Sequence, residues 1–222
     1  MSTDGSGNNT LNANTIKDGS ATKTLAEYSS SAWSWGSGVP AGTILQTKDY
    51  TFTNSRTFNG ITGVTWRWVT DTLKGGSSDH ITFDNPITAN NKVYLCFLST
   101  ICIDNYDCKF VNFFIREGSS TNDGINAGTN VAGQNTSNGD GQGIYCYSDY
   151  YTSGSQHGNT HDVSFQHAWT ESNTNPNYNI VFTATSGNSS TEMTVHIGRS
   201  GFSNYTRSDV HGYTIRLQEI QV

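Results

Sequence analysis

The chain has 222 residues and a formal net charge of −6 at pH 7, and only 33% of its residues are hydrophobic and 14% charged. A chain of this length buries roughly 70% of the surface that its unfolded form exposes, so we expect a hydrophobic core. The basic residues are scattered, which argues against a nucleic-acid partner. The longest apolar run, VYLCFL (93–98), is far shorter than the ~20 residues of a spanning helix, so we expect no membrane insertion.

Residues 1–40 are polar, with a few isolated apolar residues, and cannot bury enough surface to fold alone. They carry no basic and apolar leader, so we expect no signal peptide. The segment is either a disordered tail or an extended arm that becomes ordered against a partner, and its two tryptophans favour the arm. The candidate arm anchors are Leu11, Ile16, Trp33 and Trp35.

From residue 41 to residue 222 the pattern is that of an all-β domain. No window sustains apolar residues at helical spacing, and strand-like segments alternate with clusters of Gly, Asn, Asp and Ser. The number and length of these segments predict two packed antiparallel sheets. The expected strands are 43–53, 64–73, 79–85, 92–103, 109–117, 143–153, 161–172, 177–186, 191–200 and 213–222.

One expected strand is apolar on both faces. Val93, Leu95 and Phe97 point to one side, and Tyr94, Cys96 and Leu98 point to the other. Both faces of such a strand need a packing partner. In a two-sheet sandwich the opposing sheet covers one face, and the other face would be covered by another subunit or by the N-terminal arm. The side chains of 94, 96 and 98 are therefore the candidate subunit interface.

Three cysteines, Cys96, Cys102 and Cys108, follow one another at intervals of six. Residues six apart in one strand lie about 20 Å apart, too far for a disulfide or a shared metal ion. Cys102 and Cys108 flank the expected turn of a hairpin. They would come close enough for a disulfide in only one of the two possible pairing registers of that hairpin. We interpret the cysteines as small apolar residues on the faces of that hairpin, as thiols of a reducing compartment.

Between Gly118 and Gly143 about two dozen residues show no strand pattern, which is typical of a functional or disordered loop. The segment YCYSDYY follows it. Tyrosines near a carboxylate can stack on sugar rings, but tyrosines more often fill a core or lie at a subunit contact, and we favour that second interpretation here. The candidate glycan-binding or interface aromatics are Tyr145, Tyr147, Tyr150 and Tyr151.

The sequence gives little support for a catalytic or metal-binding site. Asp104 with Asp107, and Asp140 near Asp149, are carboxylates in turn-like sequence rather than a hydrolytic pair. A metal site would need several ligands close together, and the candidates are His157, His161, His167 and Asp162. They lie in a loop that leads into a strand, where residues four apart are some 13 Å apart, which is too far for a shared metal ion. No nucleophile elbow or phosphate-binding loop is present. We therefore expect no catalytic residue, metal ion or cofactor, and no enzymatic activity.

Several strand sequences together resemble virion proteins of marine bacteriophages. They are GTILQTKDYTFTN, NKVYLCFLSTICID with KFVNFFIREG, YNIVFTATSGNSSTEMTVHIGRSG and YTIRLQEI, and they cover about residues 41–222. The stretch TLNANTIKDGSATKTL (10–25) also resembles the start of phage tail-fibre and tail-associated proteins. These motifs are strand patterns and not catalytic signatures.

The resemblance implies a jelly-roll-like β-sandwich that forms a homotrimer on the virion surface after assembly in the host cytoplasm. It also implies that residues 1–40 attach the domain to other virion proteins. The chain lacks fibrous repeats, which favours a compact knob or decoration protein, and contact with host surface polysaccharide is compatible with either. The alternative is a free-standing carbohydrate-binding module that uses YCYSDYY and residues 119–142.

Overall fold

The structure is a computed structural model of the whole chain. It describes the backbone of residues 2–3, 9–10, 15–17, 24–29, 32–35, 39–61, 64–68, 81–104, 108–118, 129–132, 145–147, 159–186, 193–200 and 209–222. Side chains are described over most of residues 39–60, 81–103, 111–118, 160–184, 194–200 and 210–222, and at residues 129, 131 and 132. By its internal contacts the chain divides into two units, residues 1–45 with 220–222, and residues 46–219.

The N-terminal unit contains short antiparallel strands that pair with one another. β1 (Ser2–Thr3) pairs with β2 (Asn9–Thr10). β3 (Thr15–Lys17), β4 (Thr24–Ser29) and β5 (Ala32–Trp35) form a three-stranded sheet in sequence order. The sequence pattern had not indicated this pairing inside the expected arm.

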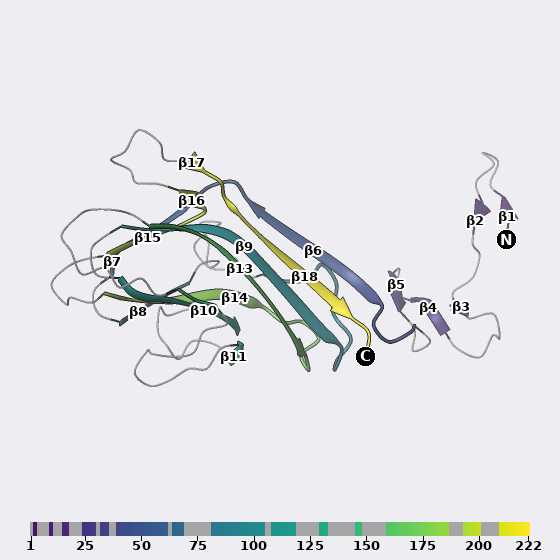
Figure 1. The fold of residues 1–222 in the computed structure, drawn as a ribbon. Coiled ribbons are helices and arrows are strands. Elements are labelled where there is room, and N and C mark those ends of the chain that lie inside the picture. Colours follow the sequence, from purple (N-terminus) through teal and green to yellow (C-terminus); the bar gives the residue numbers. More distant parts are fainter. Residues whose placement is uncertain are drawn as a thin grey trace. The chain divides into compact units, whose positions relative to one another are not determined.

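The larger unit is a sandwich of two antiparallel sheets, which confirms the expected all-β class (Figure 1). The first sheet has six strands in the order β6-β18-β9-β15-β7, with β13 on the other edge of β9. We call it the long sheet. Its strands are β6 (Ile44–Phe52), β7 (Arg56–Ile61), β9 (Lys92–Asp104), β13 (Asn159–Thr170), β15 (Met193–Ile197) and β18 (Tyr213–Ile220).

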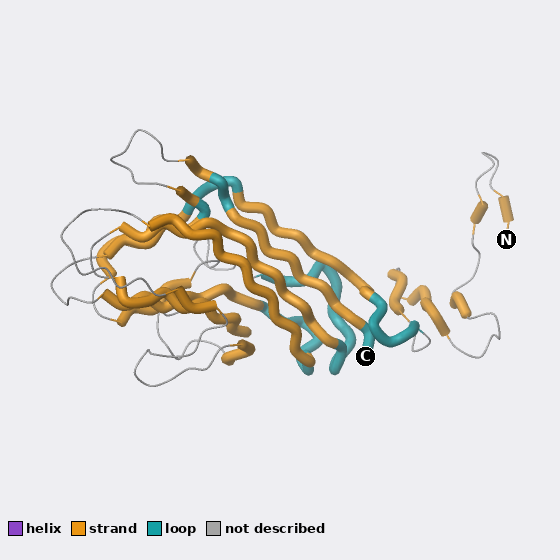
Figure 2. The backbone as a smooth tube through the Cα atoms, in the orientation of Figure 1, coloured by secondary structure: helices purple, strands orange, loops and turns teal. Residues whose placement is uncertain are grey.

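The second sheet, the short sheet, has five strands in the order β11-β10-β14-β8, with β12 also paired to β10. Its strands are β8 (Val64–Trp68), β10 (Cys108–Glu117), β11 (Thr129–Ala132), β12 (Tyr145–Tyr147) and β14 (Tyr178–Ser186). β16 (Arg199–Ser200) and β17 (Asp209–Val210) form a separate small pair. The described chain consists of strands and loops (Figure 2), and no helix in it is long and apolar enough to cross a bilayer.

Aromatic rings fill the space between the two sheets. Phe97 of the long sheet lies 5.8 Å from Phe113 of the short sheet, measured between ring centroids, and 5.1 Å from Phe165. Phe113 also lies 6.0 Å from Phe182. Because aromatic side chains bury large apolar areas and hold tilted geometries, this cluster fixes the two sheets against each other.

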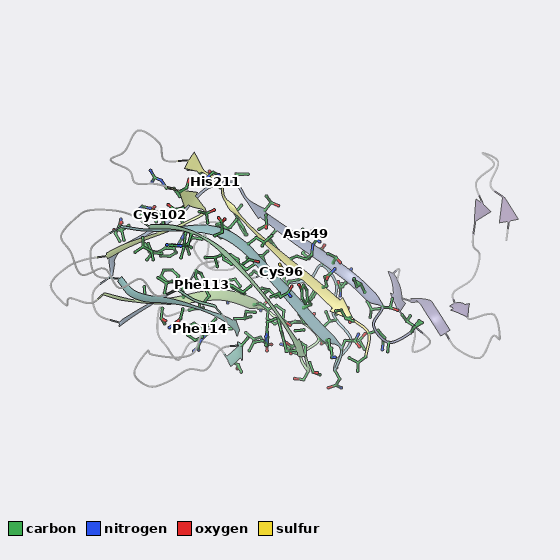
Figure 3. The ribbon with its side chains drawn as sticks, viewed as in Figure 1. Asp49, Cys96, Cys102, Phe113, Phe114 and His211 are labelled. Atoms are coloured by element: carbon green, nitrogen blue, oxygen red, sulfur yellow. The ribbon has the colours of Figure 1, made fainter. Side chains whose placement is uncertain are left out.

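In the short sheet, β10 and β14 are buried on both faces along most of the length over which their side chains are described. On β10, Phe113 faces the core and Phe114 lies on the opposite face (Figure 3), and both are fully buried. On β14, Phe182 and Val181 show the same arrangement. On β9, Val93, Leu95 and Phe97 are buried as expected and Leu98 is 49% exposed, whereas both faces are buried further along the strand, at Ile101 and Cys102.

Three expectations from the sequence are wrong. β9 and β10 do not form a hairpin, because they belong to opposite sheets. Residues 79–85 are not a strand in the described part, where Ile81 makes one isolated bridge with Tyr178 and a turn follows. The long loop is not free of strands, since it contains β11, which pairs with the end of β10. In each case a distant pairing partner decided the local structure.

Candidate functional site

The outer face of the long sheet carries the best-defined surface feature. Its members lie on three neighbouring strands, β6, β18 and β9, and point away from the core. Figure 3 labels two of them, Asp49 and Cys96. We call this set the outer-face patch, and its residues are Asp49, Tyr94, Cys96, Leu98 and Arg216.

Asp49 and Arg216 form an ion pair with two hydrogen bonds. Arg216 Nε donates to Asp49 Oδ1 at 2.7 Å and Nη2 donates to Oδ2 at 2.9 Å, so the guanidinium is held in one orientation. The hydrogen bond from Arg216 lowers the pKa of Asp49 below its ordinary value. Both side chains are about half exposed, at 55% for Arg216 and 52% for Asp49, so the pair contributes little to stability.

The three side chains predicted as a subunit interface lie together on β9. Tyr94 and Cys96 are half-buried, while Leu98 is half exposed. The Tyr94 hydroxyl donates to Gln166 Oε1 on β13, which keeps the ring down on the sheet. Partial burial raises the pKa of Tyr94 above its ordinary value, so its hydroxyl stays protonated at neutral pH.

A shallow hollow of about 280 Å³ lies over the patch. Residues of β6, β9 and β18 line it, among them Asp49, Leu98 and Arg216. A flat sheet surface with aliphatic, aromatic and paired charged groups is suited to contact with another protein surface.

Several predicted site residues are described only as backbone or lie outside the described residues. Ile16 lies on β3, and Trp33 and Trp35 lie on β5. Tyr145 and Tyr147 lie on β12, opposite Phe113 and Val111 of β10. Leu11, Tyr150 and Tyr151 lie outside the described residues, as do most of residues 119–142. Their roles stay predictions.

The cysteines agree with the interpretation as thiols where they are described. Cys96 and Cys102 are present as thiols on the same continuous strand, and Cys102 is fully buried. The side chain of Cys108 is outside the described residues, and its strand lies in the other sheet. Within the described ranges no three His, Cys, Asp or Glu residues are grouped closely enough to hold a metal ion.

Two buried carboxylates were not singled out from the sequence. Glu171 accepts hydrogen bonds from Trp169 Nε1 at 3.1 Å, from Asn173 N at 2.9 Å and from the Tyr178 hydroxyl at 2.8 Å. Glu219 accepts three hydrogen bonds as well, so both carboxylates are satisfied within the protein. One signal was present, because Glu219 occupies an inward position of the alternating strand 213–220.

No protein-family model matches the chain, and no curated protein matches it. Similar solved structures include those of infectious bursal disease virus Gx strain (10% identity, 85% of this chain, TM-score 0.34) and Gt strain (11%, 90%, 0.34). The chain spans 41% and 44% of those two chains. A bacterial lipoprotein of Bacteroides thetaiotaomicron matches at 9% identity over 81% of this chain and 94% of that one, with a TM-score of 0.33. With TM-scores this low, none of these matches bears on function.

Proposed function

We propose that this protein is a non-enzymatic structural component of a virion, exposed on the particle surface and built as a homotrimer. Residues 1–40 attach it to other virion proteins. The sequence resemblance to phage virion proteins supports this role. The observation that carries the self-association is the outer-face patch, in which Leu98 is exposed on the same face of β9 as Tyr94 and Cys96.

Charge supports contact between copies at this face. The whole chain carries −6, so two copies repel each other over most approaches. Among the described outward side chains of β6, β18, β9 and β13, Lys92 and Arg216 balance Asp49 and Asp162. A neutral face with an aliphatic centre is therefore the surface on which copies approach at the lowest electrostatic cost.

Sedimentation velocity of the full chain tests the oligomer. We expect a trimer for the natural protein and a shift to monomer for Leu98→Asp, because a carboxylate would be desolvated in the contact. Val210→Asp is the matched control, since Val210 is 51% exposed and lies on β17, away from the patch. A natural protein that sediments only as a monomer would refute the trimer, as would dissociation by Val210→Asp alone.

The place on the virion needs a separate experiment. Immunogold labelling of purified particles with antibodies against residues 46–219 should decorate the surface, and deletion of residues 1–40 should abolish incorporation into particles. Unlabelled particles would contradict the virion role without bearing on the oligomer.

The alternative, a carbohydrate-binding module, is favoured by one observation. A small pocket with polar and apolar walls lies between residues 82–86 and 174–177. This pocket is separate from the outer-face patch, so sugar binding and self-association do not exclude each other.

A further inference from the structure

Two Asn-Pro turns face each other at one end of the sandwich and enclose a pocket of about 180 Å³. One turn follows the bridge at Ile81 and the other precedes β14. We call this feature the turn pocket. It is lined by Thr82, Phe83, Asp84, Asn85, Pro86, Thr174, Asn175, Pro176 and Asn177.

The two walls are held in place by the protein itself. Ile81 and Tyr178 exchange two backbone hydrogen bonds, both at 2.9 Å, at the base of the walls. Ile87 N donates to Thr174 O at 2.9 Å and joins the turns directly. The Tyr50 hydroxyl bonds to both the N–H and the C=O of Thr82. A site whose walls are already fixed loses little conformational freedom when a ligand binds.

Asp84 is the charged group of the pocket. Lys48, which is not part of the lining, binds Asp84 Oδ1 through its Nζ at 2.6 Å. The Asp84 side chain is 67% exposed. In the described part of the chain, its Oδ2 accepts no hydrogen bond. The carboxylate is thus oriented by Lys48 while one oxygen is available to a ligand hydroxyl.

The rest of the lining combines polar and apolar groups. Asn175 and Asn177 are exposed and carry amides that both donate and accept, and Thr82 and Thr174 add hydroxyl groups. Phe83, Pro86 and Pro176 provide apolar surface beside them. A pyranose ring needs this combination, because its hydroxyls pair with acceptors and donors while its C–H face packs on apolar groups.

We propose that the turn pocket binds a single neutral sugar unit of a glycan, a hexose or an N-acetylhexosamine. The volume is below the about 300–1,000 Å³ of pockets for drug-sized ligands, so it suits one ring. The Asp84 carboxylate and the net charge of −6 disfavour anionic sugars. A calcium ion is a poorer fit, because it takes 6–8 oxygen ligands and Asp84 is the one carboxylate in the lining.

The test is saturation-transfer NMR and calorimetry with the full chain. The probes are D-glucose, D-galactose, D-mannose, N-acetyl-D-glucosamine and N-acetyl-D-galactosamine at millimolar concentration. At least one probe should bind, and Asp84→Asn and Asn175→Ala should each weaken that binding about tenfold, the loss of one hydrogen bond to a charged or polar group.

Asp162→Asn is the matched control, because it neutralises an exposed carboxylate on β13 that is not part of the lining, and it should keep binding within about threefold. Thermal unfolding of each variant verifies folding. The inference is overturned if no probe binds, or if Asp84→Asn and Asn175→Ala bind like the natural protein.

This inference rests on the carbohydrate-binding alternative and not on the oligomeric state. Sedimentation separates the two, because failure of sugar binding leaves the trimer measurement unchanged. Binding of a probe that survives both pocket variants would keep a carbohydrate-binding function but place it elsewhere on the chain.

Discussion

Glu219 on the last strand accepts a hydrogen bond from the Asn91 amide at 2.7 Å, although 128 positions separate the two residues. Its Oε1 also accepts from Thr88 N at 2.8 Å, and its Oε2 accepts from Gln46 Nε2 at 2.7 Å. A buried carboxylate of the long sheet thus anchors the segment 81–91, which supplies one wall of the turn pocket. The polar residue at an inward strand position is explained by this anchoring.

Replacement of that carboxylate should destabilise the fold strongly. Glu219→Leu leaves the Thr88 amide and the Asn91 side chain without their acceptor in a buried site, so we expect a loss of about 3 kcal/mol in the free energy of unfolding. Urea unfolding followed by tryptophan fluorescence measures it. Gln218→Ala on the neighbouring outward position should change stability by less than about 0.5 kcal/mol, and an equal effect of both variants would contradict the anchoring role.

Tyr178→Phe should have a smaller effect of the same kind. The buried Tyr178 hydroxyl donates to Glu171 Oε2 at 2.8 Å, and burial keeps the pKa of this phenol far above neutral. Removal of the hydroxyl should cost about 1–2 kcal/mol, because Glu171 keeps its bonds from Trp169 and Asn173. Chemical denaturation checks the value, and a neutral substitution would show that the hydrogen bond adds nothing to stability.

The burial of β10 on both of its faces leads to a third prediction. Phe114 on the outer face of β10 is as fully buried as Phe113 on the core face, so truncation of either to alanine should cost about 3–5 kcal/mol. Leu98→Ala on the half-exposed face of β9 should cost less than about 1 kcal/mol in a monomer. Denaturation at low protein concentration compares the three variants, and a mild Phe114→Ala would place that ring outside the packed interior.

Gly212 is required by close packing as well as by its φ of +71°. A Cβ at this position would lie 1.8 Å from the Phe52 carbonyl oxygen, an overlap that only backbone movement can relieve. Gly60 has a similar φ of +69° but nothing within 4 Å of its Cβ position. Gly60→Ala should therefore cost about 1–2 kcal/mol, the penalty for the left-handed conformation, and Gly212→Ala clearly more. Thermal unfolding ranks them, and equal midpoints would contradict the steric argument.

The pH dependence of Asp49 has a definite sign. Arg216 lowers the pKa of Asp49 in the folded state, so its contribution to stability is present above the ordinary value of 3.8 and is lost as the pH falls through the lowered pKa. Arg216→Gln should move the pKa of Asp49 back toward 3.8. Carboxyl NMR titration of both proteins checks this, and an identical pKa in the variant would show that the ion pair does not persist in solution.

The strands that alternate most regularly were predicted correctly. Residues 213–220 show inward Tyr213, Ile215, Leu217 and Glu219 as their period of two predicts. The expected strands 43–53, 92–103 and 177–186 differ from β6, β9 and β14 by at most one residue at either end. Each of these strands has an alternating or apolar pattern bounded by turn residues, so neighbouring residues alone carry the information.

The sequence also contained the turns that form the pocket, since Asn-Pro occurs at 85–86 and at 175–176. It could not show that these turns face each other, because the backbone bonds at Ile81 and Ile87 join segments about ninety positions apart. The same limit explains why β9 and β10 seemed to form a hairpin.

Periodicity and composition therefore settled the class of fold, the apolar core face of β9 and the polar exterior. They follow from local chemistry, because backbone preference and side-chain alternation depend on neighbouring residues. Tertiary structure alone decided which strand is covered on both faces, why Glu219 points inward and where two distant turns enclose a pocket. Those features depend on contacts between residues far apart in the chain, which local patterns do not encode.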